Sequence, residues 1–96
     1  MTSQATVSTT KPVAYMRQLC KHFGHRVPTA YDDSTGRITF EFGSCELVAG
    51  ADQLTLVASA AQTAELDRLK QVVGSHLERF GRRDELQVNW SEKSST

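Results

Sequence analysis

Residues 37–60 read RITFEFGSCELVAGADQLTLVASA, and their alternation of apolar and polar side chains decides the fold. Apolar residues occupy every second position from Ile38 to Phe42, which is the period of a strand with one buried face. Turn signals at residues 43–44 and 50–52 divide the stretch into three strands. Residues 27–32, VPTAYD, precede a further turn signal, so we predict an antiparallel meander of four strands.

Two amphipathic helices flank this meander. Residues 10–24 place Pro12 in a first helical turn, where its missing N–H costs little, and Gly24 just after the last apolar position. Residues 61–83 carry acidic side chains in the early turns and arginines at the end, as the helix dipole prefers. The apolar positions are Val13, Met16, Leu19, Cys20 and Phe23 in the first helix and Leu66, Leu69, Val72, Val73, Leu77 and Phe80 in the second.

Short β-prone runs lie outside the helices. Residues 4–9 predict a first strand, and residues 85–90, ELQVNW, predict a last one. The order β-α-β-β-β-β-α-β is most simply buried as an α+β two-layer sandwich, with a mainly antiparallel sheet and two helices packed on one face. We expect a single domain over residues 1–96, with an ordered core at about 5–90 and polar tails at 1–4 and 91–96.

Composition and charge exclude several classes of protein. The chain is 39% hydrophobic and 23% charged, which is ordinary usage for a folded domain. Eleven basic and eleven acidic residues cancel, so we expect no nucleic-acid partner, since such proteins usually carry a basic excess. No signal peptide or membrane-spanning run is visible, so we expect no membrane association and a cytoplasmic location. The cysteines, Cys20 and Cys45, should then be reduced.

Residues 19–25, LCKHFGH, bring one cysteine and two histidines together in the sequence. On a helix that turns about 100° per residue, Cys20 and His22 lie on nearly opposite faces. Cys20 falls in the apolar stripe and should face the sheet, so we predict no metal site shared with the histidines. Lys21, His22, His25 and Arg26 fit cations near a helix C-terminus, and the histidines also fit a ligand or anion site.

His76 lies within the apolar stripe of the second helix. Burial of an imidazole without a hydrogen-bond partner costs about 1–3 kcal/mol. We therefore expect a core histidine bonded to a backbone carbonyl or to a polar side chain such as Thr29 or Tyr31. If a pocket opens between helix and sheet instead, we expect His76 to line it with Tyr31, Cys45 and Trp90.

Signatures of catalysis and of cofactor binding are missing from the sequence. It contains no P-loop, no dinucleotide-binding glycine pattern, no C-x-x-C motif and no nucleophile elbow. Asp32 and Asp33 are adjacent carboxylates that turn chemistry explains. We predict no cofactor and a protein that is not primarily an enzyme.

Three blocks of the sequence together resemble a bacterial family catalogued as domain of unknown function 2218. The blocks are YMRQLCKHFGHRVP (15–28), GRITFEFGSCELVA (36–49) and LDRLKQVVGSHLERFGRRDELQVNW (66–90). The positions that match the family's pattern are Leu19, Lys21, His22, His25, Cys45, His76, Arg79, Phe80 and Trp90. Phe23-Gly24 replaces the Trp-Ala of the family's first block, which makes the helix end more abrupt. The resemblance implies the same fold and a loose link to iron uptake and siderophore handling.

We expect a small cytoplasmic binding or accessory domain of unknown ligand, with the link to iron or siderophores that the resemblance implies. The candidate ligand-binding residues are His22, His25, His76, Lys21 and Arg79. One alternative is a small hydrolase or lyase with His76 or His22 as general base. Another is a protein-interaction module that docks through a strand edge or the wet sheet face, at Val48 and Val57. The expected partner is a small molecule or a protein, with the chain a monomer or homodimer.

Overall fold

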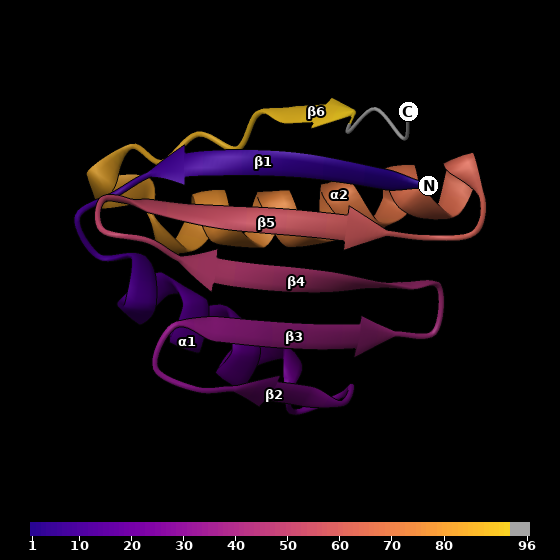
Figure 1. Ribbon diagram of the computed structural model, residues 1–96, viewed down its shortest axis with the longest axis horizontal. Coiled ribbons are helices and arrows are strands. Elements are labelled where there is room, and N and C mark those ends of the chain that lie inside the picture. Colours follow the sequence, from indigo (N-terminus) through magenta and orange to yellow (C-terminus); the bar gives the residue numbers. More distant parts are fainter. Residues whose placement is uncertain (93–96) are drawn as a thin grey trace.

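The computed structural model describes residues 1–92, which form six strands and two α-helices (Figure 1). Their bounds are β1 (Thr2–Ser8), α1 (Pro12–Phe23), β2 (Thr29–Tyr31), β3 (Thr35–Phe40), β4 (Gly43–Ala49), β5 (Gln53–Ser59), α2 (Thr63–Phe80), a 3-10 turn η1 (Arg82–Asp84) and β6 (Trp90–Glu92). The predicted order of helices and strands is confirmed. None of the helices within these residues is long and apolar enough to cross a membrane.

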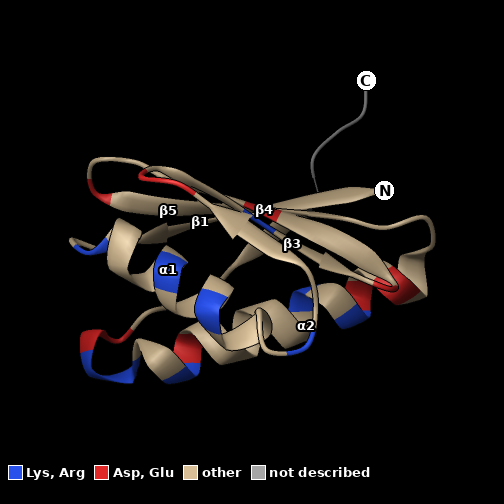
Figure 2. Ribbon diagram, turned by 90° about the horizontal axis from the view of Figure 1, so that it is seen from below, with Lys and Arg blue, Asp and Glu red and all other residues tan. Residues whose placement is uncertain are grey.

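The strands form one antiparallel sheet in the order β2-β3-β4-β5-β1-β6. β1 lies between β5 and β6, so the first and last strands within residues 1–92 are neighbours (Figure 1). Seen along the sheet, both helices lie on one face and leave the other face uncovered (Figure 2). The predicted α+β two-layer sandwich is therefore confirmed.

The core lies between this sheet and the two helices. Ile38 on β3 pairs with Cys45 on β4, and Leu47 on β4 pairs with Leu56 on β5, with all four side chains fully buried. The helices cover them with Met16, Leu19, Cys20, Leu69, Val73 and Leu77, which are also fully buried. Because burial of a leucine-sized side chain stabilises a protein by about 1.5–3 kcal/mol, these contacts hold both helices against the sheet.

The β3–β4 hairpin turns earlier than the sequence predicts. β3 ends at Phe40 and the turn falls at residues 41–42, so the predicted turn at 43–44 is wrong. Phe42 leaves the strand because its ring stacks on Phe40, with centroids 5.2 Å apart. The guanidinium of Arg68 on α2 lies 4.2 Å from the centroid of the Phe42 ring. Packing on α2 thus outweighs the alternation that favours a longer strand.

The β2–β3 turn is built by the side chain of Asp32. Its carboxylate accepts hydrogen bonds from the backbone N–H groups of Ser34 and Thr35, at 2.9 and 2.8 Å. These bonds hold the pKa of Asp32 below its usual value. Turn chemistry therefore accounts for this acidic residue, as predicted, and the turn occupies residues 32–34 in place of the predicted 33–36.

The predicted last strand at residues 85–90 is wrong, because β6 covers only Trp90–Glu92. After α2 the chain folds back, and the N–H of Leu86 donates to the carbonyl of Gly81 at 3.1 Å. The Leu86 side chain occupies the space that a Cβ on Gly81 would need. Val88 then donates its N–H to the carboxylate of Glu78 at 2.9 Å, so the partner of this N–H is a side chain and not a neighbouring strand.

The predicted polar tails are shorter than expected, because both ends of the described chain enter the sheet. β1 begins at Thr2, and Ser91 belongs to β6. The hydroxyl of Ser3, fully buried, donates to the carbonyl of Ser91 at 2.9 Å. This bond fixes the two strands to each other, while residues 93–96 of the predicted tail lie outside the described residues.

A hydrogen bond ties α1 to the turn that follows α2. The hydroxyl of Tyr15 donates to the carboxylate of Asp84, and the ammonium of Lys11 lies 3.5 Å from that carboxylate. The hydrogen bond, with burial, raises the pKa of Tyr15 to about 12, and the same bond lowers the pKa of Asp84. The phenol is therefore neutral and the carboxylate ionised at neutral pH, which makes the bond charge-assisted.

Replacement Tyr15→Phe removes this bond and keeps the ring. We expect the free energy of unfolding to fall by about 1 kcal/mol, measured by urea unfolding followed by circular dichroism. Tyr31→Phe is the matched control, because that side chain is exposed and its hydroxyl makes no hydrogen bond within residues 1–92. Equal stability of the two variants would contradict the role of the bond.

Candidate functional site

His22 and His76, predicted as ligand-binding residues on different helices, lie against each other. His22 is in the last turn of α1 and His76 is in the second half of α2. Their ring centroids are 5.0 Å apart, with 41° between the ring planes. The pair therefore joins the two helices at the point where α1 ends.

Phenylalanine rings surround the histidine pair. Phe80 lies 5.3 Å from His22, and Phe23 lies 5.0 Å from His76, measured between ring centroids. Phe23 also contacts Phe40 on β3, at 5.2 Å. Such ring pairs contribute about 0.5–1.5 kcal/mol each beyond their buried area. The histidines thus extend an aromatic cluster from the sheet to the surface, where His22 is exposed and His76 half-buried.

The His76 ring is oriented by its own helix. Its Nδ1 lies 2.6 Å from the carbonyl oxygen of Val72. A carbonyl oxygen only accepts, so Nδ1 carries the proton and Nε2 presents the lone pair of the neutral ring. The predicted bond to a backbone carbonyl is confirmed. The carbonyl belongs to Val72, in the preceding turn of α2, and the ring lies at the edge of the core.

Positive charge gathers around His22. Desolvation by the surrounding side chains, followed by the charges of His76, His25, Arg26 and Arg79, lowers the pKa of His22 below its ordinary value of 6.5. None of the ion pairs within residues 1–92 includes Arg26 or Arg79. The junction between the two helices therefore carries cationic groups that no carboxylate of the described chain neutralises.

Lys21 lies apart from the other candidate residues. It shares the outer surface of α1 with Ala14, Arg17 and Gln18, where the four side chains line a shallow hollow. One step of about 100° around the helix turns it away from His22. The structure thus brings together His22, His25, His76 and Arg79 and adds Arg26. Across residues 1–92, no group of three or more His, Cys, Asp or Glu side chains could hold a metal ion.

Both Cys20 and Cys45 are fully buried in the core, as the apolar stripe predicts for Cys20. Burial raises the pKa of both thiols, and that of Cys45, which also has Cys20 as a neighbour, reaches about 12. Since the thiolate is the reactive form, neither side chain has the properties of a nucleophile.

The predicted pocket that would combine His76 with Tyr31, Cys45 and Trp90 is not formed. Tyr31 belongs to β2 and Trp90 to β6, which are the opposite edges of the sheet. Cys45 lies on β4 beneath the helices with no exposed surface. The strand order, which the sequence does not specify, separates these residues.

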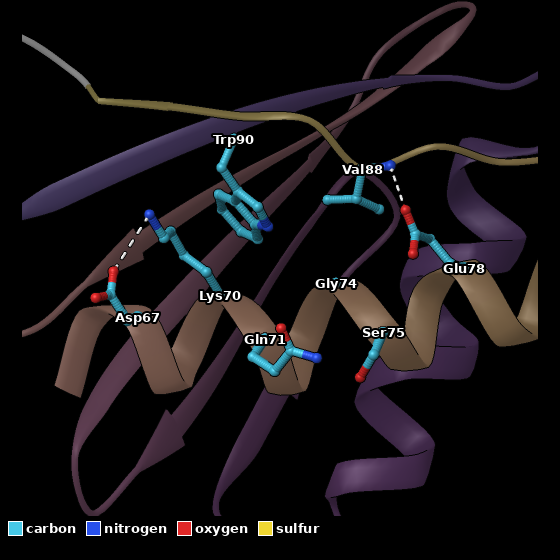
Figure 3. A pocket seen from close by; sticks show the side chains of 8 residues that line it. All are labelled: Asp67, Lys70, Gln71, Gly74, Ser75, Glu78, Val88 and Trp90. Carbon is cyan, nitrogen blue, oxygen red and sulfur yellow. Dashed lines mark hydrogen bonds and ion pairs between the residues drawn. The ribbon is translucent and has the colours of Figure 1, made fainter. Parts of the chain in front are cut away.

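A groove that the sequence analysis missed runs along the other flank of α2 (Figure 3). Its volume is about 360 Å³. Its lining residues are Asp67, Lys70, Gln71, Gly74, Ser75, Glu78, Val88 and Trp90. The signal that could have revealed it is Gly74, because a glycine inside a helix costs about 1 kcal/mol relative to alanine and so indicates a close approach.

The uncovered face of the sheet is mostly uncharged, because the exposed positions of its strands are mainly Thr, Ser, Gln and Val. Arg37 and Glu46 form an ion pair across β3 and β4 at 3.4 Å. Val48 is 44% exposed, and with Tyr31 it lines a hollow at the β2–β4 end of the sheet. Val57 is half-buried. Docking of a protein on this face stays a prediction.

The fold and the junction of the helices define a small two-layer α+β domain with a cationic, histidine-containing surface. The chain belongs to the family described as "Uncharacterized protein conserved in bacteria (DUF2218)", which matches residues 4–91. The resemblance seen in the sequence is thereby confirmed. The chain is similar to the NMR structure of PA4090 from Pseudomonas aeruginosa, with 29% identity over 98% of each chain and a TM-score of 0.81. No curated protein matches it.

The lowered pKa of His22 predicts a pH-dependent stability. As the pH falls, the unfolded chain takes up a proton at His22 before the folded chain does, so stability declines from the ordinary histidine pKa down to the folded one. Replacement His22→Phe keeps the ring contacts and removes the ionisation. We expect the free energy of unfolding of the variant, compared with that of the parent chain, to become larger as the pH is lowered from about 8 to about 5. Parallel curves for the two proteins would contradict this.

Because the two thiols are buried, we expect them to react slowly with a disulfide reagent such as dithiobis(nitrobenzoate). We expect neither Cys20 nor Cys45 to react in the folded protein at about pH 8, and both to react at once in urea. The release of thionitrobenzoate, followed by absorbance, measures this. Rapid reaction of one equivalent without denaturant would show that a thiol is accessible.

Proposed function

We propose that this chain is a small cytoplasmic binding domain that captures an anionic group of a small molecule at the junction of α1 and α2. The observation that carries the proposal is the contact of His22 with His76 among cationic groups that lack a carboxylate partner within residues 1–92. The description of the family assigns no activity, so the proposal rests on the chemistry of the site.

Capture of an anion at this junction needs no bond chemistry. The guanidinium groups of Arg26 and Arg79 offer charge-assisted hydrogen bonds to a carboxylate, phosphate or sulfate group. His22 and His76 become additional donors when protonated. Desolvation and, after it, neighbouring cations lower the pKa of His22, and an anion that offsets the charge of the cations raises it again. Binding is therefore coupled to proton uptake, and the affinity increases as the pH falls.

Anion capture fits the site better than general-base catalysis by His76 or His22. A histidine that activates a nucleophile of its own chain lies within hydrogen-bond reach of a hydroxyl or thiol. In the part of the chain that the structure describes, the histidine hydrogen bond is the one from His76 to Val72, and no hydroxyl or thiol is bonded to either ring. In the proposed function, the two rings contribute positive charge and do not remove protons.

The link to iron or siderophore handling, which the family resemblance implies, stays a prediction. A junction that accepts anionic groups would take iron as an anionic chelate with free carboxylates, and not as the bare cation. The cationic surroundings of His22 disfavour a metal ion at this position.

Titration with sulfate tests the proposal, because sulfate keeps its charge throughout the range in which histidine ionises. We expect saturable chemical-shift changes around His22 and His76, with a lower Kd at about pH 6 than at about pH 8. Sodium chloride at equal ionic strength is the reference, since sulfate also stabilises proteins by exclusion from their surface.

Two variants that remove the same charge make the test specific. Arg79→Gln removes a cation from the junction, and we expect the Kd for sulfate to rise roughly fivefold or more. Lys21→Gln removes a cation from the outer surface of α1, and we expect little change in the Kd. Equal effects of the two changes, or a Kd independent of pH, would overturn the proposal and leave the cations as groups that stabilise helix ends.

A further inference from the structure

The groove on the outer flank of α2 is separate from the histidine junction. Figure 3 shows the indole of Trp90 and the side chain of Val88 on one side and α2 on the other. The groove lies between the helix and the chain segment that leads into β6, whereas His76 points toward α1. Its volume of about 360 Å³ is within the range of about 300–1,000 Å³ that small-molecule sites occupy.

Gly74 lets the indole of Trp90 lie close to α2, because glycine has no side chain. A Cβ at this position would lie 3.1 Å from Nε1 of Trp90 and 3.5 Å from Cγ1 of Val88. The indole therefore approaches the helix backbone directly and forms a wall of the groove. Nε1 is the indole atom nearest to the Gly74 position, so this edge of the ring faces α2.

The charge of the groove is negative. Lys70 pairs with Asp67 at 3.6 Å, so these two side chains offset each other (Figure 3). One carboxylate oxygen of Glu78 accepts the N–H of Val88, and the other is bonded to no group of the described chain. No cation within residues 1–92 forms an ion pair with Glu78. A single uncompensated carboxylate thus lies beside an apolar wall.

We propose that this groove binds small organic cations, in which a protonated amine is joined to an apolar body. The ammonium group pairs with the free oxygen of Glu78, and the apolar body packs on Val88 and Trp90. Indole is also the ring that attracts cations most strongly. An anionic ligand would face the Glu78 carboxylate, because the ammonium of Lys70 already has a partner.

Fluorescence of Trp90 reports on the groove, since the sequence contains one tryptophan. Three probes share one ring and differ in charge: cyclohexylammonium, cyclohexanol and cyclohexanecarboxylate. At neutral pH we expect a saturable change in emission with cyclohexylammonium and affinities about tenfold weaker or worse for the other two. Equal binding of cyclohexanol, preference for the carboxylate, or no saturable response to the amine would each overturn the proposal.

Charge-matched variants locate the binding. Glu78→Gln keeps an oxygen that accepts the N–H of Val88 and removes the negative charge. We expect the Kd for cyclohexylammonium to rise about tenfold, while Glu41→Gln, an exposed change in the β3–β4 turn, leaves it unaltered. Equal effects of the two changes would show that the amine responds only to net charge and would overturn the assignment.

A third variant tests the groove without a change in charge. Gly74→Ala places a methyl group against Trp90 and narrows the space, although alanine favours the helix by about 1 kcal/mol. We expect a folded protein, shown by unchanged circular dichroism, whose affinity for cyclohexylammonium is several times lower. Undiminished affinity in folded Gly74→Ala would place the amine elsewhere on the protein.

Discussion

One face of the sheet is apolar and must be covered, and this constraint sets the position of the two helices and of the segment before β6. Leu47 and Leu56, paired across β4 and β5, point to the same side and are fully buried. Both helices pack on that side, so α2 has an inner flank that meets α1 and an outer flank that meets the segment before β6 (Figures 1 and 2). The histidine junction forms on the first flank and the tryptophan groove on the second. Each candidate site is thus a consequence of how the apolar face is closed.

Local periodicity predicted the fold because the helices and strands follow their hydrophobic patterns closely. The stripe that contains Met16, Leu19 and Cys20 faces the sheet as its spacing requires. The errors fall where a side-chain contact competes with strand pairing. Phe42 stacks beneath Arg68, and Leu86 folds over Gly81, and both contacts end or shift a strand that alternation alone would extend. Such contacts depend on tertiary geometry, which a local pattern does not contain.

The candidate site was predicted only in part, because its geometry also depends on tertiary contacts. His22 and His76 were identified as residues, but their contact depends on the spacing of the two helices and is invisible in the sequence. Lys21 adjoins His22 in the chain and still faces elsewhere, because one residue is a large step around a helix. The tryptophan groove was missed because its defining feature is an absent side chain, at Gly74, opposite a segment whose path was predicted incorrectly.

The position of β1 between β5 and β6 has a consequence for how the chain acquires its structure during synthesis. β1 is synthesised before the other strands of this sheet, but the hydroxyl of Ser3 bonds a residue 88 positions later. Pairing over such distances slows folding, because the intervening chain must be ordered before the contact forms. Until β6 is complete, β1 has an open edge, and its sequence TSQATVS holds no charged residue to discourage pairing with another chain. β1 is therefore most exposed to pairing with another chain in the interval before β6 takes its place beside it.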